Sequence, residues 1–494
     1  MSLRSKVFKG GSQLAFGQMA GQACSFLRNI IIARLISPSD FGIAATFAMT
    51  LSLMEMISNV AAEMQLIQSP DGDNPRLQAT AQFMKVSRGF INGAILLILA
   101  VPMSRLFGVP QAKWAFACLA IFPLAGGFTH LDMFRMQREM KFMPSIWVTA
   151  GSNVLVTLVT VPLAYWLRNY SVMLWVLVLQ AVSTAVGSHL VADRHYTWTW
   201  NKEDAKKILS FGWPLLVNGL LMYAIFEGDR LVIGSAKRLF PHSQFTLTDL
   251  GIYSVAFSLT MAPTMLVANV ATSLFLPILS RTQDEQREFD ERYLFTSQII
   301  SLVAIGITIP FILAGGWVVT LLYGRKYAAA AGFIGWLAAM WGIRIFRIAP
   351  TVAAIAKGDT QNAMFGNMAR SVALIGMFAV AAVGGALTWI PICGLAGEIL
   401  ASAVTIWRLF HRNRVSAMTC LRPFAPFAAG MILAGLSVAE GVVRWGPIYA
   451  LLTSIAITGV AMMAMLVLFP NLRQDFRSLI RNPEERVTQG SPAD

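Results

Sequence analysis

The chain has 494 residues, of which 56% are hydrophobic and 13% are charged. A soluble domain carries roughly 25% charged residues, so this chain could not cover a water-facing surface of its own size, and a soluble enzyme is excluded. The net charge is +14, and in a membrane protein such an excess points first to topology and not to nucleic acid.

About fourteen segments are long and apolar enough to span a membrane, since a spanning helix needs about 20 mostly apolar residues. In chain order they are 12–35, 41–67, 83–103, 112–134, 145–166, 170–192, 211–235, 250–276, 295–315, 328–350, 363–385, 389–407, 424–443 and 447–469. The second segment contains Glu55 and Glu63, and the tenth contains Arg344 and Arg347. The connections between segments are short, so we expect function to reside between helices or in loops.

The positions of the cations predict the orientation in the membrane, because Lys and Arg collect on the cytoplasmic side. With the N-terminus placed in the cytoplasm, 23 of the 39 cations fall in cytoplasmic segments and 9 on the opposite side. We therefore expect both termini in the cytoplasm. Seven cations remain at or near membrane depth: Arg28, Lys85, Arg88, Arg230, Arg344, Arg347 and Arg370.

Three local matches indicate an internal repeat, and they occur in the same order in each half. Residues 40–43 (DFGI) resemble 249–252 (DLGI), residues 28–32 resemble 230–234, and 106–108 (LFG) resemble 322–324 (LYG). A unit of six helices spans the membrane an even number of times, so the two copies share one orientation. Transporters built from such parallel repeats enclose a site between their halves.

The expected fold is therefore an all-α membrane protein with two six-helix bundles in a parallel pseudo-two-fold repeat and two further helices. We expect bundles at 1–200 and 201–415, helices 13 and 14 at 416–470, and a cytoplasmic tail at 471–494. In this tail, apolar and basic residues alternate with helical spacing, which is typical of a short helix on an anionic membrane surface.

The segment from Arg28 to Phe47 reads RNIIIARLISPSDFGIAATF. Its A-R-x-L sequence, its turn of a small residue, Pro and an acidic residue, and the following aromatic-Gly-Ile resemble the first-helix signature of polysaccharide transporters. These are the Wzx-type lipid-linked oligosaccharide flippases of the MOP superfamily. The basic stretch from Phe134 to Phe142 is similar to the loop that follows the fourth helix of this family.

This resemblance implies a transporter of the bacterial inner membrane that works by alternating access. Its expected substrate is an undecaprenyl-diphosphate-linked oligosaccharide, turned from the cytoplasmic to the periplasmic leaflet for exopolysaccharide, capsule or O-antigen synthesis. The resemblance also implies a monomer that passes its product to polysaccharide polymerase and chain-length machinery. Cofactors, metals and nucleic acid are not expected.

A diphosphate needs a cationic path through the membrane, and arginine suits it because its planar fork stays charged and binds phosphate through two hydrogen bonds. Arg28 and Arg230 occupy matching places in the two repeats and are candidates to contact the diphosphate. Arg344 and Arg347 are three residues apart, so they share one helix face. Arg88 is a further candidate. For Arg88 and Arg370, a side chain reaching toward lipid headgroups is the simpler interpretation.

Acidic residues at membrane depth could carry a coupling proton or Na⁺. Glu55 and Glu63 are eight residues apart and so lie on nearly one face of a continuous helix. Either could instead pair with Arg28. Asp132 is a weaker candidate for the same role, as are Glu398 and Glu440.

No catalytic or metal-binding motif stands out: the four cysteines and five histidines are dispersed, and no phosphate-binding glycine loop occurs. Two alternatives to the flippase stay open. One is a multidrug extrusion protein of the same superfamily, which would favour acidic cavity residues. The other is a membrane-embedded polysaccharide polymerase or ligase.

Overall fold

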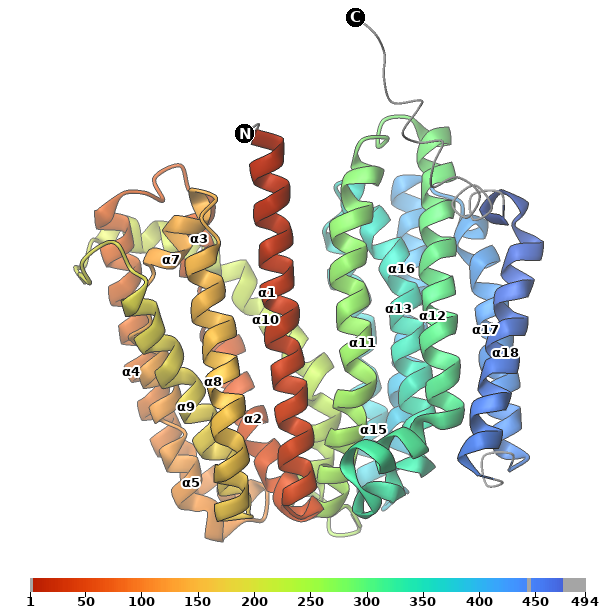
Figure 1. Ribbon diagram of the computed structural model, residues 1–494, viewed down its shortest axis with the longest axis horizontal. Coiled ribbons are helices and arrows are strands. Elements are labelled where there is room, and N and C mark those ends of the chain that lie inside the picture. The colour runs from red at the N-terminus through yellow and green to blue at the C-terminus, as the bar shows by residue number, and fades with distance from the viewer. Residues whose placement is uncertain (1–2, 442–445, 474–494) are drawn as a thin grey trace, which may run out of the picture. The chain divides into compact units, whose positions relative to one another are not determined.

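The computed structural model describes residues 3–441 and 446–473 (Figure 1). All regular elements in these residues are helices, as the sequence predicts. The predicted amphipathic tail falls almost entirely at 474–494, outside the described residues. The described chain divides into two compact units, each presented by itself below.

Unit 1 comprises Met1–Val255 together with two short segments from later in the chain, Leu322–Tyr327 and Met377–Ala386. Its helices are α1 (Leu3–Leu35), α2 (Pro38–Ser58), α3 (Ala62–Gln68), α4 (Pro75–Leu106), η1 (Pro110–Ala112), α5 (Lys113–Cys118), α6 (Ile121–Gly127), α7 (Asp132–Arg138), α8 (Met143–Leu167), α9 (Ser171–Leu190) and α10 (Lys202–Leu239), followed by the start of α11 (Leu247–Ser280). In this unit α10 packs against α2 and α4.

Unit 2 contains the rest of α11 and the C-terminal helices. These are α12 (Gln286–Tyr323), η2 (Arg325–Gly332), α13 (Ile334–Ala356), α14 (Gln361–Ser371), α15 (Ala373–Ala382), α16 (Trp389–Asn413), α17 (Ala417–Ala439) and α18 (Pro447–Leu468), although short parts of α12, η2 and α15 belong to unit 1. Seventeen of the 23 residues of α13 are buried, which makes this helix the centre of unit 2. It packs against α14 and α16, while α17 packs against α18.

Eleven helices in the described chain are long and apolar enough to cross a membrane, or twelve if the bent pair Pro110–Gly127 and Asp132–Arg138 forms one span. The predicted count of about fourteen is therefore not confirmed. The two remaining predicted spans, 12–35 and 211–235, lie in α1 and α10, which are long helices of lower hydrophobicity. The predicted boundary at 200/201 does not coincide with the boundary of the compact units, and the predicted domain limits stay a prediction.

The second predicted span is broken, and this corrects the expectation that Glu55 and Glu63 share a helix face. Helix α2 ends at Ser58, and Ala61 takes a left-handed conformation at φ 51° before α3 begins. The Asn59 side chain accepts a hydrogen bond from the Ala61 amide at 2.9 Å and so holds the turn. Glu55 and Glu63 consequently sit on two different helices.

The repeated tetrapeptides meet within unit 1. Gly42 of α2 and Gly251 of α11 pack against each other's helix so closely that a Cβ on Gly42 would lie 1.9 Å from the Leu247 carbonyl oxygen. A Cβ on Gly251 would lie 1.9 Å from the Pro38 carbonyl oxygen. This reciprocal contact, here called the glycine contact, is what a local two-fold relation between the repeats produces.

The same relation extends to the helix caps and turns of the repeat. Ser37 caps α2 by accepting from the Asp40 amide at 3.0 Å, and Thr246 accepts from the Asp249 amide at 3.2 Å. Gly108 and Gly324, which end the matched tripeptides, both have positive φ, at 67° and 96°. Left-handed glycines are common just after a helix, so the matched sequences perform the same local task in both halves.

Candidate functional site: a buried arginine cluster

Three arginines gather around one glutamate inside unit 2. Arg344 and Arg347 come from α13, Arg370 from α14 and Glu398 from α16, and these four residues are called the arginine cluster below. Because α13 turns once in 3.6 residues, its two arginines point from the same face, as predicted. The cluster therefore combines charged side chains from the three helices that form the centre of the unit.

Glu398 contacts all three arginines. Its Oε1 lies 2.9 Å from Nη1 of Arg344 and 3.0 Å from Nε of Arg370, and its Oε2 lies 3.3 Å from Nη2 of Arg347. The exposed fractions of the four side chains are 14% for Arg344, 6% for Arg347, 3% for Arg370 and 2% for Glu398. The charges are therefore held largely out of solvent.

Two glycines give the arginines room. A Cβ on Gly366 of α14 would lie 2.9 Å from Nη1 of Arg347, and one on Gly397 of α16 would lie 3.3 Å from Cδ of Arg370. The absence of side chains at these positions lets α14 and α16 close around the guanidinium groups. On the other side, the Arg344 guanidinium lies 5.7 Å from the ring centre of Trp341, within cation–π range.

The cluster carries three positive charges and one negative charge, so two positive charges are not neutralised within it. Burial of charge is expensive unless each ion is paired and its hydrogen bonds are made. Within the described residues, the buried Nε of Arg347 has no hydrogen-bond partner. A site with surplus charge and a free donor can bind an anion.

The other predicted arginines have separate surroundings in unit 1. Arg28 is half-buried and donates to the neutral side chains of Gln180, at 3.2 Å, and Ser25, at 3.4 Å. Arg230 pairs with Glu227, three residues earlier on α10, at 2.8 Å. Arg88 is half-buried on α4. Contact of these three residues with a substrate stays a prediction.

The three predicted ion-coupling carboxylates also differ from one another. Glu55 is exposed on α2, whereas Glu63 pairs with Lys85 at 2.7 Å. Asp132 is fully buried and lies 2.6 Å from Nε of Arg135; it also accepts hydrogen bonds from the backbone amides of residues 193 and 194. These contacts give Glu63 and Asp132 structural partners, and ion coupling by any of the three stays a prediction.

Two members of the cluster were missed by the sequence reasoning. Arg370 was interpreted as a residue that reaches lipid headgroups, and this is wrong because its side chain is buried against Glu398. For Glu398 the sequence predicts only a possible role in ion coupling. Their sole signal was a charge at membrane depth, because partners on separate helices leave no spacing pattern in the sequence.

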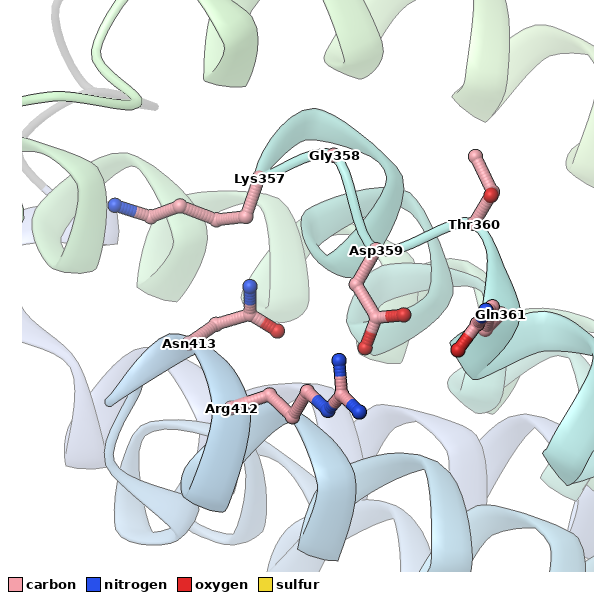
Figure 2. A pocket seen from close by; sticks show the side chains of 7 residues that line it. All are labelled: Lys357, Gly358, Asp359, Thr360, Gln361, Arg412 and Asn413. Atoms are coloured by element: carbon pink, nitrogen blue, oxygen red, sulfur yellow. The ribbon is translucent and has the colours of Figure 1, made fainter.

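A second feature is a hollow of about 400 Å³ at the loop between α13 and α14 (Figure 2). Its lining consists of Lys357, Gly358, Asp359, Thr360, Gln361, Arg412 and Asn413. Figure 2 shows the Asp359 and Arg412 side chains directed into it, and Asp359 also pairs with Arg408 at 3.3 Å. Arg412 is exposed, so water can solvate this charge without a ligand. The arginine cluster is the stronger candidate because its charges are buried.

Comparison with solved structures shows which class of membrane protein shares this fold. The chain superimposes on the lipid II flippase MurJ in an inward closed conformation with a TM-score of 0.66 at 10% identity, covering 95% of this chain and 100% of that one. It superimposes on a multidrug resistance MATE family transporter of the MOP superfamily with a TM-score of 0.60 at 14% identity, covering 81% and 95%. The chain thus has the all-α fold of these membrane transporters.

The family model described as polysaccharide biosynthesis protein matches residues 31–332, and the chain belongs to this family. The resemblance inferred from residues 28–47 is thereby confirmed. The arginine cluster, at residues 344–398, lies after the matched segment.

Two relatives carry informative names. The succinoglycan biosynthesis transport protein ExoT of Rhizobium meliloti is 19% identical over 72% of this chain and 70% of its own length. The lipopolysaccharide biosynthesis protein WzxC of Escherichia coli is 19% identical over 66% of this chain and 65% of its own length. The chain thus spans about two thirds of the length of these relatives.

Proposed function

We propose that this protein is a flippase that moves an undecaprenyl-diphosphate-linked oligosaccharide from the cytoplasmic to the periplasmic leaflet of a bacterial inner membrane. It does so by alternating access, and it supplies exopolysaccharide, capsule or O-antigen synthesis. Support comes from relatives named for succinoglycan transport and lipopolysaccharide biosynthesis, and from a fold shared with a lipid II flippase. We further infer that the protein is a transporter and not an enzyme, because ExoT is named as a transport protein and MurJ as a flippase.

The observation that carries the proposal is the surplus of two positive charges in the arginine cluster. A diphosphate that links a lipid to a sugar has one acidic oxygen on each phosphorus, so it carries two negative charges at neutral pH. The two negative charges of the diphosphate would balance the two surplus positive charges of the four cluster residues. Arginine forks bind phosphate oxygens through paired hydrogen bonds, and these bonds strengthen where water is excluded.

The same charge disfavours the multidrug alternative. Drugs that are organic cations would be repelled by the arginine cluster, since like charges at close range in a poorly solvated site cost several kcal/mol, about 4 kcal/mol at 4 Å in surroundings typical of a protein. An anionic substrate is attracted by the same amount. The fold alone does not separate the two substrates, because both kinds of transporter share it.

The orientation forms part of the proposal: both termini lie in the cytoplasm, as the distribution of 23 cations against 9 favours. We further propose that a monomer is sufficient and that a polymerase with its chain-length machinery uses the product. A fluorescent protein that matures only in the cytoplasm, fused to the C-terminus, should be bright. A dark fusion at normal abundance would reverse the assigned orientation.

The proposed function is tested by reconstitution. The purified protein is placed in lipid vesicles that contain a fluorescent polyprenyl-diphosphate oligosaccharide, and a membrane-impermeant reagent quenches the outer leaflet. We expect quenching to pass well beyond the outer-leaflet fraction when protein is present. Quenching that stops at the level of protein-free vesicles, with correctly folded protein, would refute the proposal.

A further inference from the structure

Glu398 occupies the position between three guanidinium groups where an anion would bind. One of its oxygens is shared by Arg344 and Arg370, while the other faces Arg347. Carboxylate and phosphate present similar acceptor oxygens to an arginine fork. The glutamate side chain thus has the place and the chemistry of a ligand that is built into the protein.

The contacts of Glu398 are shared and incomplete. Its Oε2 is buried and makes no hydrogen bond among the described residues, although Arg347 lies 3.3 Å away. Arg347 has a free Nε donor and a second contact at 3.5 Å, to the Asn367 side chain. Arg347 therefore keeps a donor for which Glu398 supplies no acceptor, and a larger anion could accept that hydrogen bond.

A neighbouring ion pair in the same unit differs from the cluster in its ratio of charges, although the buried Nε of Arg408 also makes no hydrogen bond among the described residues. Arg408 of α16 pairs with Asp359, and the two side chains are 10% and 9% exposed. This pair joins one cation to one carboxylate and has the simple form of a structural ion pair. In the arginine cluster a single carboxylate is instead shared by three guanidinium groups.

We propose that Glu398 is an internal stand-in for the anionic group of the substrate. In the empty site it holds Arg344, Arg347 and Arg370 together, and it releases them when a diphosphate takes its place. The inference rests on the proposed function, since it assigns the arginine cluster as the site for the diphosphate. It adds that substrate and glutamate compete for the same donors.

Competition has a measurable consequence. When a site is free for only a fraction of the time, the apparent affinity falls by that fraction. Removing the competitor should therefore strengthen anion binding, whereas a purely structural glutamate would leave binding unchanged or weaken it when removed. The direction of the change separates the two roles.

The experiment measures binding of inorganic pyrophosphate to the full chain in lipid nanodiscs by calorimetry. We expect Glu398→Gln to bind at least tenfold more tightly than the unaltered protein. Glu398→Asp, which keeps the charge on a shorter side chain, should fall between the two and decides the matter if Glu398→Gln does not fold. Arg347→Gln should lose most of the binding. Asp359→Asn, which removes a buried carboxylate beside Arg408, should leave it unchanged.

The outcomes distinguish the two proposals. Unchanged or weaker binding in both Glu398 variants, with Arg347→Gln still losing binding, would overturn the stand-in role and leave the anion site intact. An equal gain in Asp359→Asn would also overturn it, because the effect would then be general electrostatics. If no variant binds pyrophosphate, or if Arg347→Gln binds as well as the unaltered protein, the cluster is not the diphosphate site and both proposals fail.

Discussion

At the scale of the residue, the charges in this chain fall into two kinds. Lys85 with Glu63 and Arg408 with Asp359 join one cation to one carboxylate. The arginine cluster instead gathers three cations around a single carboxylate, that of Glu398. We propose that this sharing of one carboxylate by three arginines marks a site for an anionic ligand, whereas the two ion pairs hold helices together.

The Lys85–Glu63 pair should behave as a structural pair. The side chains are 10% and 21% exposed, so Glu63→Gln would leave the ammonium group poorly solvated and without its counter-charge. We expect a loss of about 2 kcal/mol, less than for a fully buried pair. Thermal unfolding in detergent should show the lower midpoint, and the double variant Glu63→Gln with Lys85→Met should recover most of it.

An additional loss in that double variant would contradict the structural role of the pair.

At the residue scale, two of the four members of the arginine cluster could be predicted together from the sequence. The i, i+3 spacing of Arg344 and Arg347 predicted a shared face, and both residues meet at Glu398. Arg370 and Glu398 were beyond reach because each stands alone on its own helix. Their partnership depends on how three helices pack, and two glycines that permit this packing carry no charge signal.

At the scale of the element, the strongest structural support for the internal repeat is the glycine contact between Gly42 and Gly251. Two matched tetrapeptides place their glycines against each other's backbone, and matched Ser37–Asp40 and Thr246–Asp249 caps start the two helices. The match could be predicted from sequence because it is local. The break between α2 and α3 could not, since Ser58 and Asn59 are two polar residues inside a mostly apolar segment and do not by themselves specify a turn.

The glycine contact predicts an asymmetry between glycines. In Gly42→Ala the new Cβ would meet the Leu247 carbonyl oxygen at 1.9 Å, so the two helices must separate. We expect a loss of about 3 kcal/mol or more, in the upper range for overpacking, and a large drop in membrane abundance. Gly151→Ala is the control, because nothing lies within 4 Å of its Cβ on α8.

Thermal unfolding of the two variants in detergent gives the comparison. Equal stability of Gly42→Ala and Gly151→Ala would mean that the close approach of the two helices is not needed.

At the scale of the whole molecule, composition and one motif already indicated the class. A charged fraction of 13% predicts a membrane protein, and residues 28–47 resemble the polysaccharide transporters, a family that the match over 31–332 confirms. The number of spans was harder to predict. Helices α1 and α10 carry polar residues through their length, and the fourth predicted span is broken into short helices with a bend of 47°.

The central claim joins the arginine cluster to lipid flipping, and one measurement addresses it most directly. Vesicles containing a polyprenyl-diphosphate oligosaccharide are reconstituted with the unaltered protein, with the double variant Arg344→Gln and Arg347→Gln, or with Asp359→Asn, and the initial rate of leaflet exchange is compared. We predict that the double arginine variant loses at least tenfold in rate while Asp359→Asn keeps the rate of the unaltered protein. An unchanged rate in a folded double variant would contradict the claim.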